Sequence, residues 1–200
     1  MCGRYFIDIN EKELRDIISK IEKNSTEIYK TDEIFPTNVV PIVTKYGCIL
    51  AKWGFPKRNY RGVIINARVE SLSERSMFKN LVNTKRCIIP ASAYFEWKKN
   101  DNNNIKKYKL KNLDSILYIA GLYDTFSESS KQLSLFEDNS KQDFLAFTII
   151  TKEANDYVSS IHNRMPLICS KEEMSLWLNG YDIDALVSQN NYALTYSPAD

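Results

Sequence analysis

The sequence predicts an α+β fold: a single compact domain with a largely antiparallel, β-barrel-like core and a few flanking helices. Apolar runs of strand length recur along the chain, turn-forming residues separate them in hairpin order, and strands and helices do not alternate regularly. Hydrophobic residues make up 44% of the 200 residues, which is enough for a sizeable buried core. We therefore expect residues 1–200 to fold as one domain.

The first half of the chain is expected to begin with an extended segment, residues 4–9, followed by a helix. Asn10 is placed to cap that helix, whose apolar side chains recur at helical spacing. Those side chains are Leu14, Ile17, Ile18 and Ile21. A second helix is expected over residues 73–82. Runs rich in β-branched and apolar residues predict strands at residues 39–44, 48–53 and 63–67, with a turn at residues 45–47.

The second half is expected to add four strands, a long loop and a helix. The first strand covers residues 86–97, where Pro90 indicates a sheet edge or a bulge because proline lacks the N–H of the ladder. The others cover residues 108–111, 117–124 and 144–151, and the Asn- and Lys-rich stretch after Lys98 predicts a hairpin tip. Residues 127–143 are polar and predict a surface loop. Ser170 and Glu173 match a capping box, which opens a helix that Gly180 can end.

Composition excludes several classes of protein. The formal net charge is +2, so an anionic partner must be met by a local cluster of cations. No apolar run approaches the ~20 residues of a membrane span, and the N-terminal residues lack the apolar segment of a signal peptide. We expect no membrane association and a cytoplasmic location, at the nucleoid if the chain is bacterial. One histidine and four widely spaced cysteines give no metal-ligand spacing, so we expect neither metal nor cofactor.

Cys2 differs from the other three cysteines. Cys48, Cys87 and Cys169 lie in apolar runs, which predicts buried and inert thiols. Removal of Met1 would give Cys2 a free α-amine beside its thiol, and this pair can convert an aldehyde first to a Schiff base and then to a thiazolidine ring. An α-amine has a pKa of about 7.7–8.0, so much of it is nucleophilic near neutral pH. On Met1 and Cys2 alone, a chance cysteine is the simpler interpretation.

Three further residues could carry chemistry. Glu96 lies among aromatic residues at the end of an apolar run, where burial would raise the pKa of its carboxyl; the alternative is a solvated strand end. His162 is the sole histidine, and its polar neighbours Asn163 and Arg164 favour an acid on the phosphate side over an ordinary structural histidine. Asn66 follows an apolar strand and can orient a reacting group or hold a turn.

Arginine usage points to an anionic partner. The chain is rich in lysine, yet arginines stand beside the polar residues named above or in apolar strands near them. They are Arg4, Arg68, Arg86 and Arg164. Arginine binds phosphate through two parallel hydrogen bonds, which lysine cannot do. Chance clustering and ion pairs with Glu70 are the alternatives.

Taken together, these segments resemble the SOS response-associated peptidase (SRAP) family, and they occur in the family's order along nearly the whole chain. The matching segments are Met1–Arg4; Phe35–Thr37 with Val39–Pro41; Trp53 and Gly54; Asn66–Arg68 with Glu70; Arg86–Pro90 and Tyr94–Trp97; Ala120–Leu122; Thr148–Thr151 with Ala154 and Asn155; and His162–Pro166. The ordered set, with cysteine at position 2, is far more specific than any one segment.

The resemblance implies a protein that binds single-stranded DNA at abasic sites and bonds covalently to the opened sugar, shielding the lesion during repair. It also implies autoproteolytic loss of Met1, so the expected activities are those of a cysteine-dependent autopeptidase and a lyase-like Schiff-base former. Cys2 is the implied nucleophile, Asn66 positions it, Glu96 moves protons, and His162 assists sugar opening. The implied DNA-binding residues are Arg4, Pro36, Trp53, Arg68, Lys79 and Arg164. We expect a monomer.

The sequence departs from the family pattern in a few places. Residues 55–60 replace the usual segment after Trp53 and Gly54, which leaves open which side chain wedges between bases. Lys79 stands where arginine is common, Asn38 where glutamine is typical, and Asn163 where aspartate is usual. Two other functions stay open: a non-covalent reader of modified or single-stranded DNA, and a Cys-His protease acting on other proteins.

Overall fold

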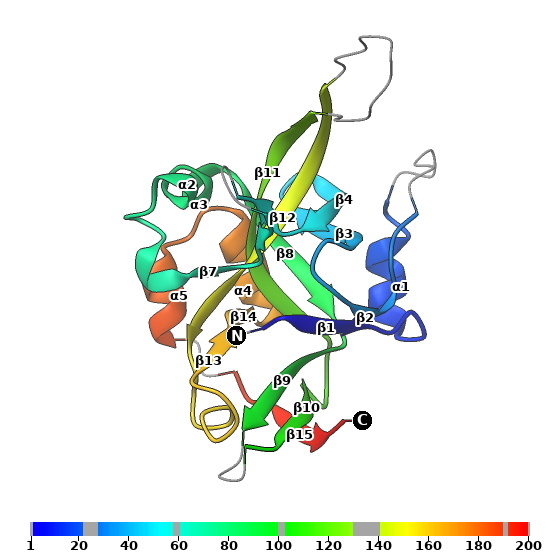
Figure 1. Ribbon diagram of the computed structural model, residues 1–200, viewed down its shortest axis with the longest axis vertical. Helices are drawn as coiled ribbons and strands as arrows, with labels where there is room; N and C mark the ends of the chain where they lie inside the picture. Colours follow the sequence, from blue (N-terminus) through cyan, green and yellow to red (C-terminus); the bar gives the residue numbers. More distant parts are fainter. Residues whose placement is uncertain are drawn as a thin grey trace.

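The computed structural model describes residues 2–21, 28–57, 61–99, 103–129, 141–189 and 192–199, and it confirms the α+β class (Figure 1). Its centre is a barrel of five strands: β3 (Val39–Thr44), β4 (Gly47–Trp53), β8 (Arg86–Ala91), β11 (Leu117–Ser129) and β12 (Lys141–Glu153). β12 pairs with both β4 and β11, and this closes the ring. The pairs are antiparallel except for β12 with β4, which run parallel.

A second sheet has the strand order β15-β10-β9-β1-β2. Its members are β1 (Arg4–Ile7), β2 (Asp32–Ile34), β9 (Ala93–Lys99), β10 (Ile105–Lys111) and β15 (Thr195–Pro198). β8 of the barrel and β9 of this sheet are separated only by a bend at Ser92. The expected single strand over residues 86–97 is therefore two strands in two sheets. The chain leaves the barrel at this bend, which fixes where the second sheet meets the barrel wall.

Pro90 does not mark an edge strand, because β8 lies between β3 and β11. The expectation of an edge is wrong for a local reason. β3 pairs with β8 only at Ile88 and Cys87, so Pro90 lies beyond the end of that ladder. On the other side Pro90 is opposite Tyr118 of β11. A residue without an N–H is tolerated where one neighbouring strand has already ended.

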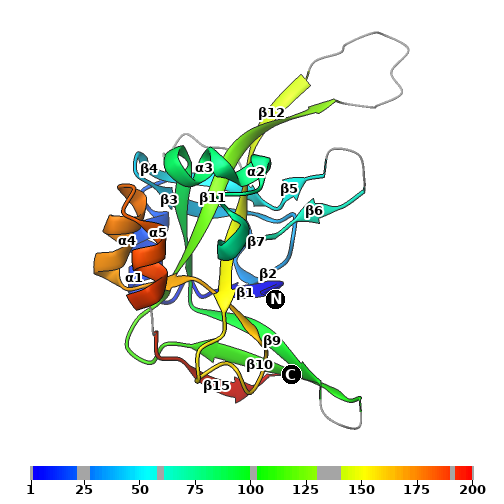
Figure 2. The same ribbon diagram turned by 90° about the vertical axis from the view of Figure 1, so that its left-hand side faces the viewer.

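Short helices cover one side of the barrel. They are α1 (Lys12–Ile18), α2 (Ser76–Lys79), α3 (Leu81–Thr84), α4 (Lys171–Leu178) and α5 (Ile183–Gln189), with a 3₁₀ turn at Val69–Ser71. Figure 2 shows α4 and α5 on the side of the barrel away from the N-terminus. The capping box that opens α4 is confirmed, since Glu173 N donates to Ser170 Oγ and Ser170 N to the Glu173 carboxylate. Gly180 follows the helix with a φ of 87°, as a terminating glycine should.

Several predicted boundaries are wrong. Glu11, not Asn10, is the N-cap of α1, and its side chain makes no capping bond. The helix expected over residues 73–82 is the two one-turn helices α2 and α3. The strand expected over residues 63–67 is divided between β6 (Val63–Ile64), which pairs with β5 (Phe55–Pro56), and β7 (Asn66–Arg68), which pairs with β12. Pairing with two different partners explains the break.

The loop expected over residues 127–143 is shorter than the composition suggested. β11 and β12 remain paired out to Ser129 and Lys141, so both ends of the segment are strand; residues 130–140 lie outside the described part of the chain. The tip of the β9–β10 hairpin, residues 100–102, also lies outside it. In the described residues, no helix is long and apolar enough to cross a membrane.

Candidate active site

The site lies where the second sheet meets the barrel wall. Cys2 lies two residues before the start of β1 and is 0% exposed. The Asn66 side chain, at the start of β7, donates from Nδ2 to the main-chain oxygen of Cys2 over 2.9 Å. β7 is held in place by its parallel pairing with β12 of the barrel. Two segments 64 residues apart in sequence are thus joined at residue 2.

Glu96 reaches the same place from β9. β1 and β9 pair antiparallel with Arg4 opposite Phe95, which brings residue 96 alongside the start of the chain. Glu96 is 2% exposed, which decides between the two sequence interpretations in favour of a buried carboxyl. Burial raises the pKa of Glu96, and the charge of His162 opposes that rise. Burial also raises the pKa of the Cys2 thiol, and the negative charge of Glu96 raises it further.

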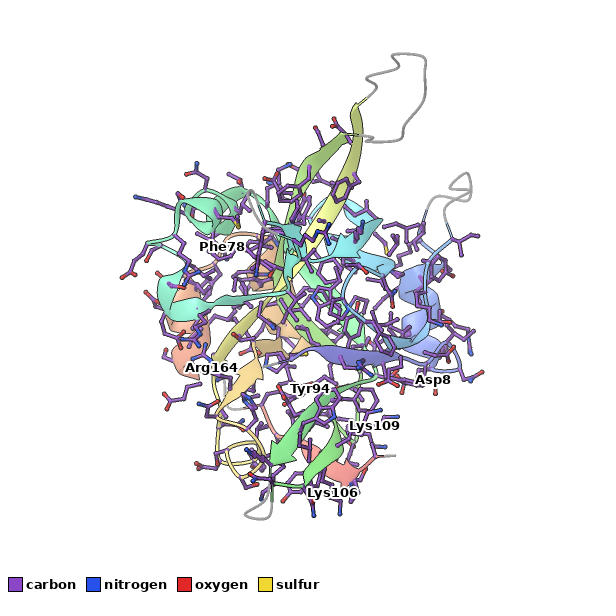
Figure 3. All side chains as sticks on the ribbon, viewed as in Figure 1. Asp8, Phe78, Tyr94, Lys106, Lys109 and Arg164 are labelled. Carbon is purple, nitrogen blue, oxygen red and sulfur yellow. The ribbon has the colours of Figure 1, made fainter. Side chains whose placement is uncertain are left out.

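Two tyrosines that sequence reasoning missed complete the buried cluster. Tyr5 and Tyr94 face each other across the β1–β9 ladder, and both are buried; Figure 3 marks Tyr94. Burial raises the pKa of both phenols, and the charge of Cys2 raises both further. In the described part of the chain neither hydroxyl has a hydrogen-bond partner, and neither does Oδ1 of Asn66. The period of two along β9 could have indicated Tyr94, because it lies on the same strand face as Glu96.

His162 is half-buried and follows a run of turns at residues 156–161. The main-chain N–H of Arg164 donates to its Nδ1 over 2.9 Å. Nδ1 also lies 3.2 Å from the main-chain oxygen of Arg164. The shorter contact, in which Nδ1 accepts, favours the neutral tautomer with its proton on Nε2. A positive charge on this imidazole would lower the pKa of Glu96. His162 and Glu96 therefore belong to one electrostatic unit.

Arg164 is held by a carboxylate. Its Nη1 and Nη2 atoms donate to the two oxygens of Glu70 over 2.6 and 2.9 Å, and Nη2 also donates to the main-chain oxygen of Thr151 over 2.7 Å. This bidentate pair lowers the pKa of Glu70, first through the hydrogen bond from Arg164. The alternative noted from the sequence, an ion pair with Glu70, is thus correct for Arg164.

Arg4 lies at the other side of the site. Its Nη1 donates to Glu33 over 2.9 Å, and its Cζ lies 3.8 Å from the centre of the Phe35 ring and 5.4 Å from that of Trp97. Phe35 itself is 42% exposed. A turn at Pro36 and Thr37 presents it, closed by a 3.1 Å hydrogen bond from Asn38 N to Phe35 O. Thr37 adopts a φ of 75°, a left-handed conformation that costs a β-branched residue about 1–3 kcal/mol.

The remaining predicted DNA-binding residues differ in accessibility. Arg68 and Lys79 are exposed, and Pro36 is half-buried. Trp53 is 0% exposed, with its indole N–H bonded to Ile65 O over 3.1 Å and its ring stacked 6.3 Å from that of Phe147. In this structure Trp53 supports the site from the core and cannot touch DNA directly. Residues 58–60, from the segment that departs from the family pattern, lie outside the described residues.

All four cysteines are buried and free. The prediction is confirmed for Cys48, Cys87 and Cys169, and Cys2 is buried as well. Arg86 is also buried and donates to three main-chain carbonyls, so it is not available to a phosphate. No cluster of three His, Cys, Asp or Glu side chains that could hold a metal ion occurs among the residues described.

Comparison with known proteins agrees with this geometry. The SRAP family, described as SOS response associated peptidase, matches residues 1–197. The chain belongs to the SRAP family. It is 31% identical over 202 aligned positions to the abasic site processing protein YoqW of Bacillus subtilis, covering 92% of this chain and 83% of that protein. Against YoaM of the same organism, also named an abasic site processing protein, the identity is 36% over 58% of this chain and 47% of YoaM.

Solved structures share the fold of this SRAP protein. A crystal structure of a protein from Bacteroides thetaiotaomicron superposes with a TM-score of 0.77 at 21% identity, covering 100% of this chain and 92% of the other. A protein from Bordetella bronchiseptica gives a TM-score of 0.78 at 18% identity, with both chains covered completely. At these identities the likeness concerns the fold alone.

Proposed function

We propose that this SRAP protein processes abasic sites by forming a covalent bond between Cys2 and the opened sugar of single-stranded DNA. The hydrogen bond from Asn66 to the Cys2 carbonyl carries the proposal. It fixes residue 2 beside the buried carboxyl of Glu96. The names of the relatives YoqW and YoaM support the abasic site as substrate.

The proposed reaction begins with hydrolytic loss of Met1, which frees the α-amine of Cys2. The amine adds to the C1′ aldehyde of the ring-opened deoxyribose, and loss of water gives an imine. The Sγ atom of Cys2 then adds to the imine carbon while its proton passes to the nitrogen. A five-membered thiazolidine results, with water as the only product released in the capture steps. No electron is gained or lost, so no redox partner is required.

Glu96 is the proposed carrier of protons in these steps. Addition of the amine requires a base, and loss of water from the adduct requires an acid. Burial raises the pKa of Glu96, and a carboxyl with a raised pKa is better suited to act both as base and as acid. Burial also raises the pKa of the Cys2 thiol, so a nearby base is needed before sulfur can attack. The Glu96 carboxyl can meet both requirements: proton transfer during imine formation and deprotonation of the Cys2 thiol.

His162 is the proposed acid on the sugar side. Its Nδ1 accepts a hydrogen bond from Arg164, so the proton available for donation is on Nε2. A donor at that position can protonate the ring oxygen of the closed deoxyribose as the aldehyde forms. Action as a monomer is part of the proposal.

The test is capture of abasic DNA by the purified protein and by Cys2→Ser. Serine keeps the amine but is a poor nucleophile for ring closure, so we expect an adduct that survives denaturing electrophoresis only with the parent. The serine variant should give an adduct only after reduction of the imine. Equal yields of heat-stable adduct from both proteins would contradict the thiazolidine.

One observation favours a second function, non-covalent reading of abasic or single-stranded DNA. The Cys2 thiol is fully buried and its pKa is raised, so in this state it is not a thiolate at neutral pH. A reader of this kind would bind abasic DNA, and no adduct would survive denaturation with either the parent or Cys2→Ser.

A further inference from the structure

The second sheet has two faces of different character. One face carries Tyr5, Tyr94 and Glu96 and belongs to the buried site. Side chains alternate along a strand, so the neighbouring residues point the other way. The cross-strand pairs Arg4 with Phe95, Phe95 with Lys109, and Trp97 with Lys107 therefore share the opposite face. We call this the lysine face; its members are Arg4, Phe6, Phe95, Trp97, Lys107, Lys109 and Lys111.

On the lysine face cations lie directly over aromatic rings. Lys109 Nζ lies 4.4 Å from the centre of the Phe6 ring, and Lys107 Nζ lies 4.3 Å from that of Phe95. The two rings pack edge to face with centres 6.5 Å apart. Figure 3 marks Lys109 on β10 of this sheet. The ammonium groups of β10 thus lie over rings of β1 and β9, and Phe95 is buried beneath Lys107.

Acidic residues on this face are unevenly placed. Glu33 accepts from Arg4 over 2.9 Å and from Lys107 over 3.0 Å, so these two cations share one carboxylate. Burial raises the pKa of Glu11, and the positive charges of Lys109 and Lys111 oppose that rise. Within the described residues, no carboxylate lies within ion-pair distance of Lys109 or Lys111. These two ammonium groups can accept an external anion.

We propose that the lysine face binds the single strand of nucleic acid that continues from the abasic site. This proposal rests on the proposed function, because that function places the lesion at Cys2. Sequence-tolerant binding of single strands combines cations along the backbone with aromatic rings on which bases stack, and both occur here. A phosphate that draws the lysine ammonium aside uncovers the ring beneath it. An acidic protein partner would pair with the cations, but it would have no bases to stack on the aromatic rings.

The spacing suits a short stretch of strand. β1 and β10 are separated by β9, so two strand spacings of about 4.8 Å place Lys109 about 10 Å from the line of β1. At the roughly 3.4 Å rise of stacked bases, this corresponds to about three nucleotides. Arg4 lies on the same face only two residues from Cys2, so the path from the site to the lysines is continuous. The strand would cross the sheet and not follow a single β-strand.

The test compares two double variants of equal charge. In Lys109→Gln/Lys111→Gln the two lysines of the face are neutralised, one half-buried and one exposed. In the matched control, Lys45→Gln/Lys85→Gln, the lysines have the same two degrees of exposure and lie over Tyr46 and Tyr123, outside the second sheet. Binding of the full-length protein to undamaged single-stranded oligonucleotides is measured against salt concentration.

We expect the face variant to bind about tenfold more weakly at low salt, with a log–log salt slope shallower by about 1.4, since each lost phosphate contact on a single strand removes about 0.7. The control variant should match the parent both in affinity at low salt and in salt slope. Equal losses in the two variants would mean a general charge effect and would overturn the proposal, as would parental binding by the face variant.

A second comparison separates this proposal from the proposed function. Capture is measured on abasic oligonucleotides with a long flank only on the 5′ side or only on the 3′ side. The face variant should lose affinity for one of the two, while capture at saturating DNA stays at the parental level. Equal losses of affinity for the two oligonucleotides would contradict the proposal that the strand follows one path from the site to the lysine face. If the parent captures nothing, the proposed function fails, and the salt titration still decides the lysine face.

Discussion

Two buried polar regions of this molecule are built in opposite ways. On the helical side of the barrel, Arg86 donates from Nη1 to the carbonyl oxygens of Trp177 and Tyr181 over 3.2 and 2.6 Å, and from Nε to that of Val82. Its Cζ also lies 4.2 Å from the centre of the Trp177 ring. At the N-terminal edge, by contrast, the hydroxyls of Tyr5 and Tyr94 lack partners in the described part of the chain.

The difference separates structure from function. A buried polar group that is fully hydrogen-bonded stabilises the fold, whereas one left unpaired costs free energy and needs an explanation. Arg86 joins α3, α4 and the segment after α4 to the barrel. The cluster around Cys2 instead leaves buried polar atoms without hydrogen-bond partners among the described residues. Under the proposed function, such a cluster serves the substrate and not the fold.

The comparison predicts its largest effect at Arg86. Arg86→Ala leaves three carbonyls without their donor, so the free energy of unfolding should fall by about 3 kcal/mol or more. Urea denaturation measures the loss, and Lys85→Ala, one residue away, should change stability by less than about 0.5 kcal/mol. Capture of abasic DNA per folded molecule should stay parental. A loss below about 1 kcal/mol would mean that Arg86 is not a structural clamp.

Glu96→Gln should show the opposite behaviour. The folded state raises the pKa of Glu96, so it holds the carboxyl proton more tightly than the unfolded chain does. The stability associated with this proton is present below the usual carboxyl range and is lost as pH rises through the raised pKa. Glutamine has no such loss, so the variant should be more stable than the parent above that range, by about 1 kcal/mol, and equal to it in acid.

Unfolding curves of both proteins between about pH 4 and pH 8, which bracket the ordinary carboxyl pKa, check this prediction. The same variant should form the adduct more slowly at every pH in that range, while binding undamaged DNA as the parent does. A stability advantage that does not depend on pH would contradict the assigned cause, and a parental rate of capture would remove Glu96 from the proposed chemistry.

The smallest effect is expected for the unpaired hydroxyl of Tyr94. Tyr94→Phe removes a buried group that makes no hydrogen bond to any described residue, so stability should be unchanged or rise by about 1 kcal/mol. A matched change elsewhere is Tyr118→Phe, since that hydroxyl donates to Glu13 and its loss should destabilise by about 1 kcal/mol. A larger loss at Tyr94 than at Tyr118 would contradict the difference between the two regions.

The sequence allowed the class of fold and the candidate site to be predicted, because both depend on local patterns. The Ser170 capping box and the hairpin at residues 39–53 follow from a few adjacent residues. The bend at Ser92 could not be predicted, because it depends on β8 and β9 joining different sheets. The break at Ile65 has the same origin, in pairing partners that lie far away in sequence.

The site shows the same limit. The aromatic neighbours of Glu96 left burial and a solvated strand end open, and the structure shows that the side chain is buried. The pairing of Arg164 with Glu70 could only be weighed against phosphate binding, since it joins residues 94 positions apart. Trp53 illustrates the converse: resemblance implied a contact with DNA, yet the side chain is in the core. The sequence indicated candidate residues and left open what each of them touches.

The central claim is that Cys2 reacts as an aminothiol, and the intact mass of the protein tests it most directly. The purified chain should be lighter than the encoded sequence by one methionine residue. After incubation with an abasic oligonucleotide, it should gain the mass of that oligonucleotide less one water, the balance expected for a thiazolidine. A chain that retains Met1, or one that loses Met1 and gains no mass from abasic DNA, would contradict the account.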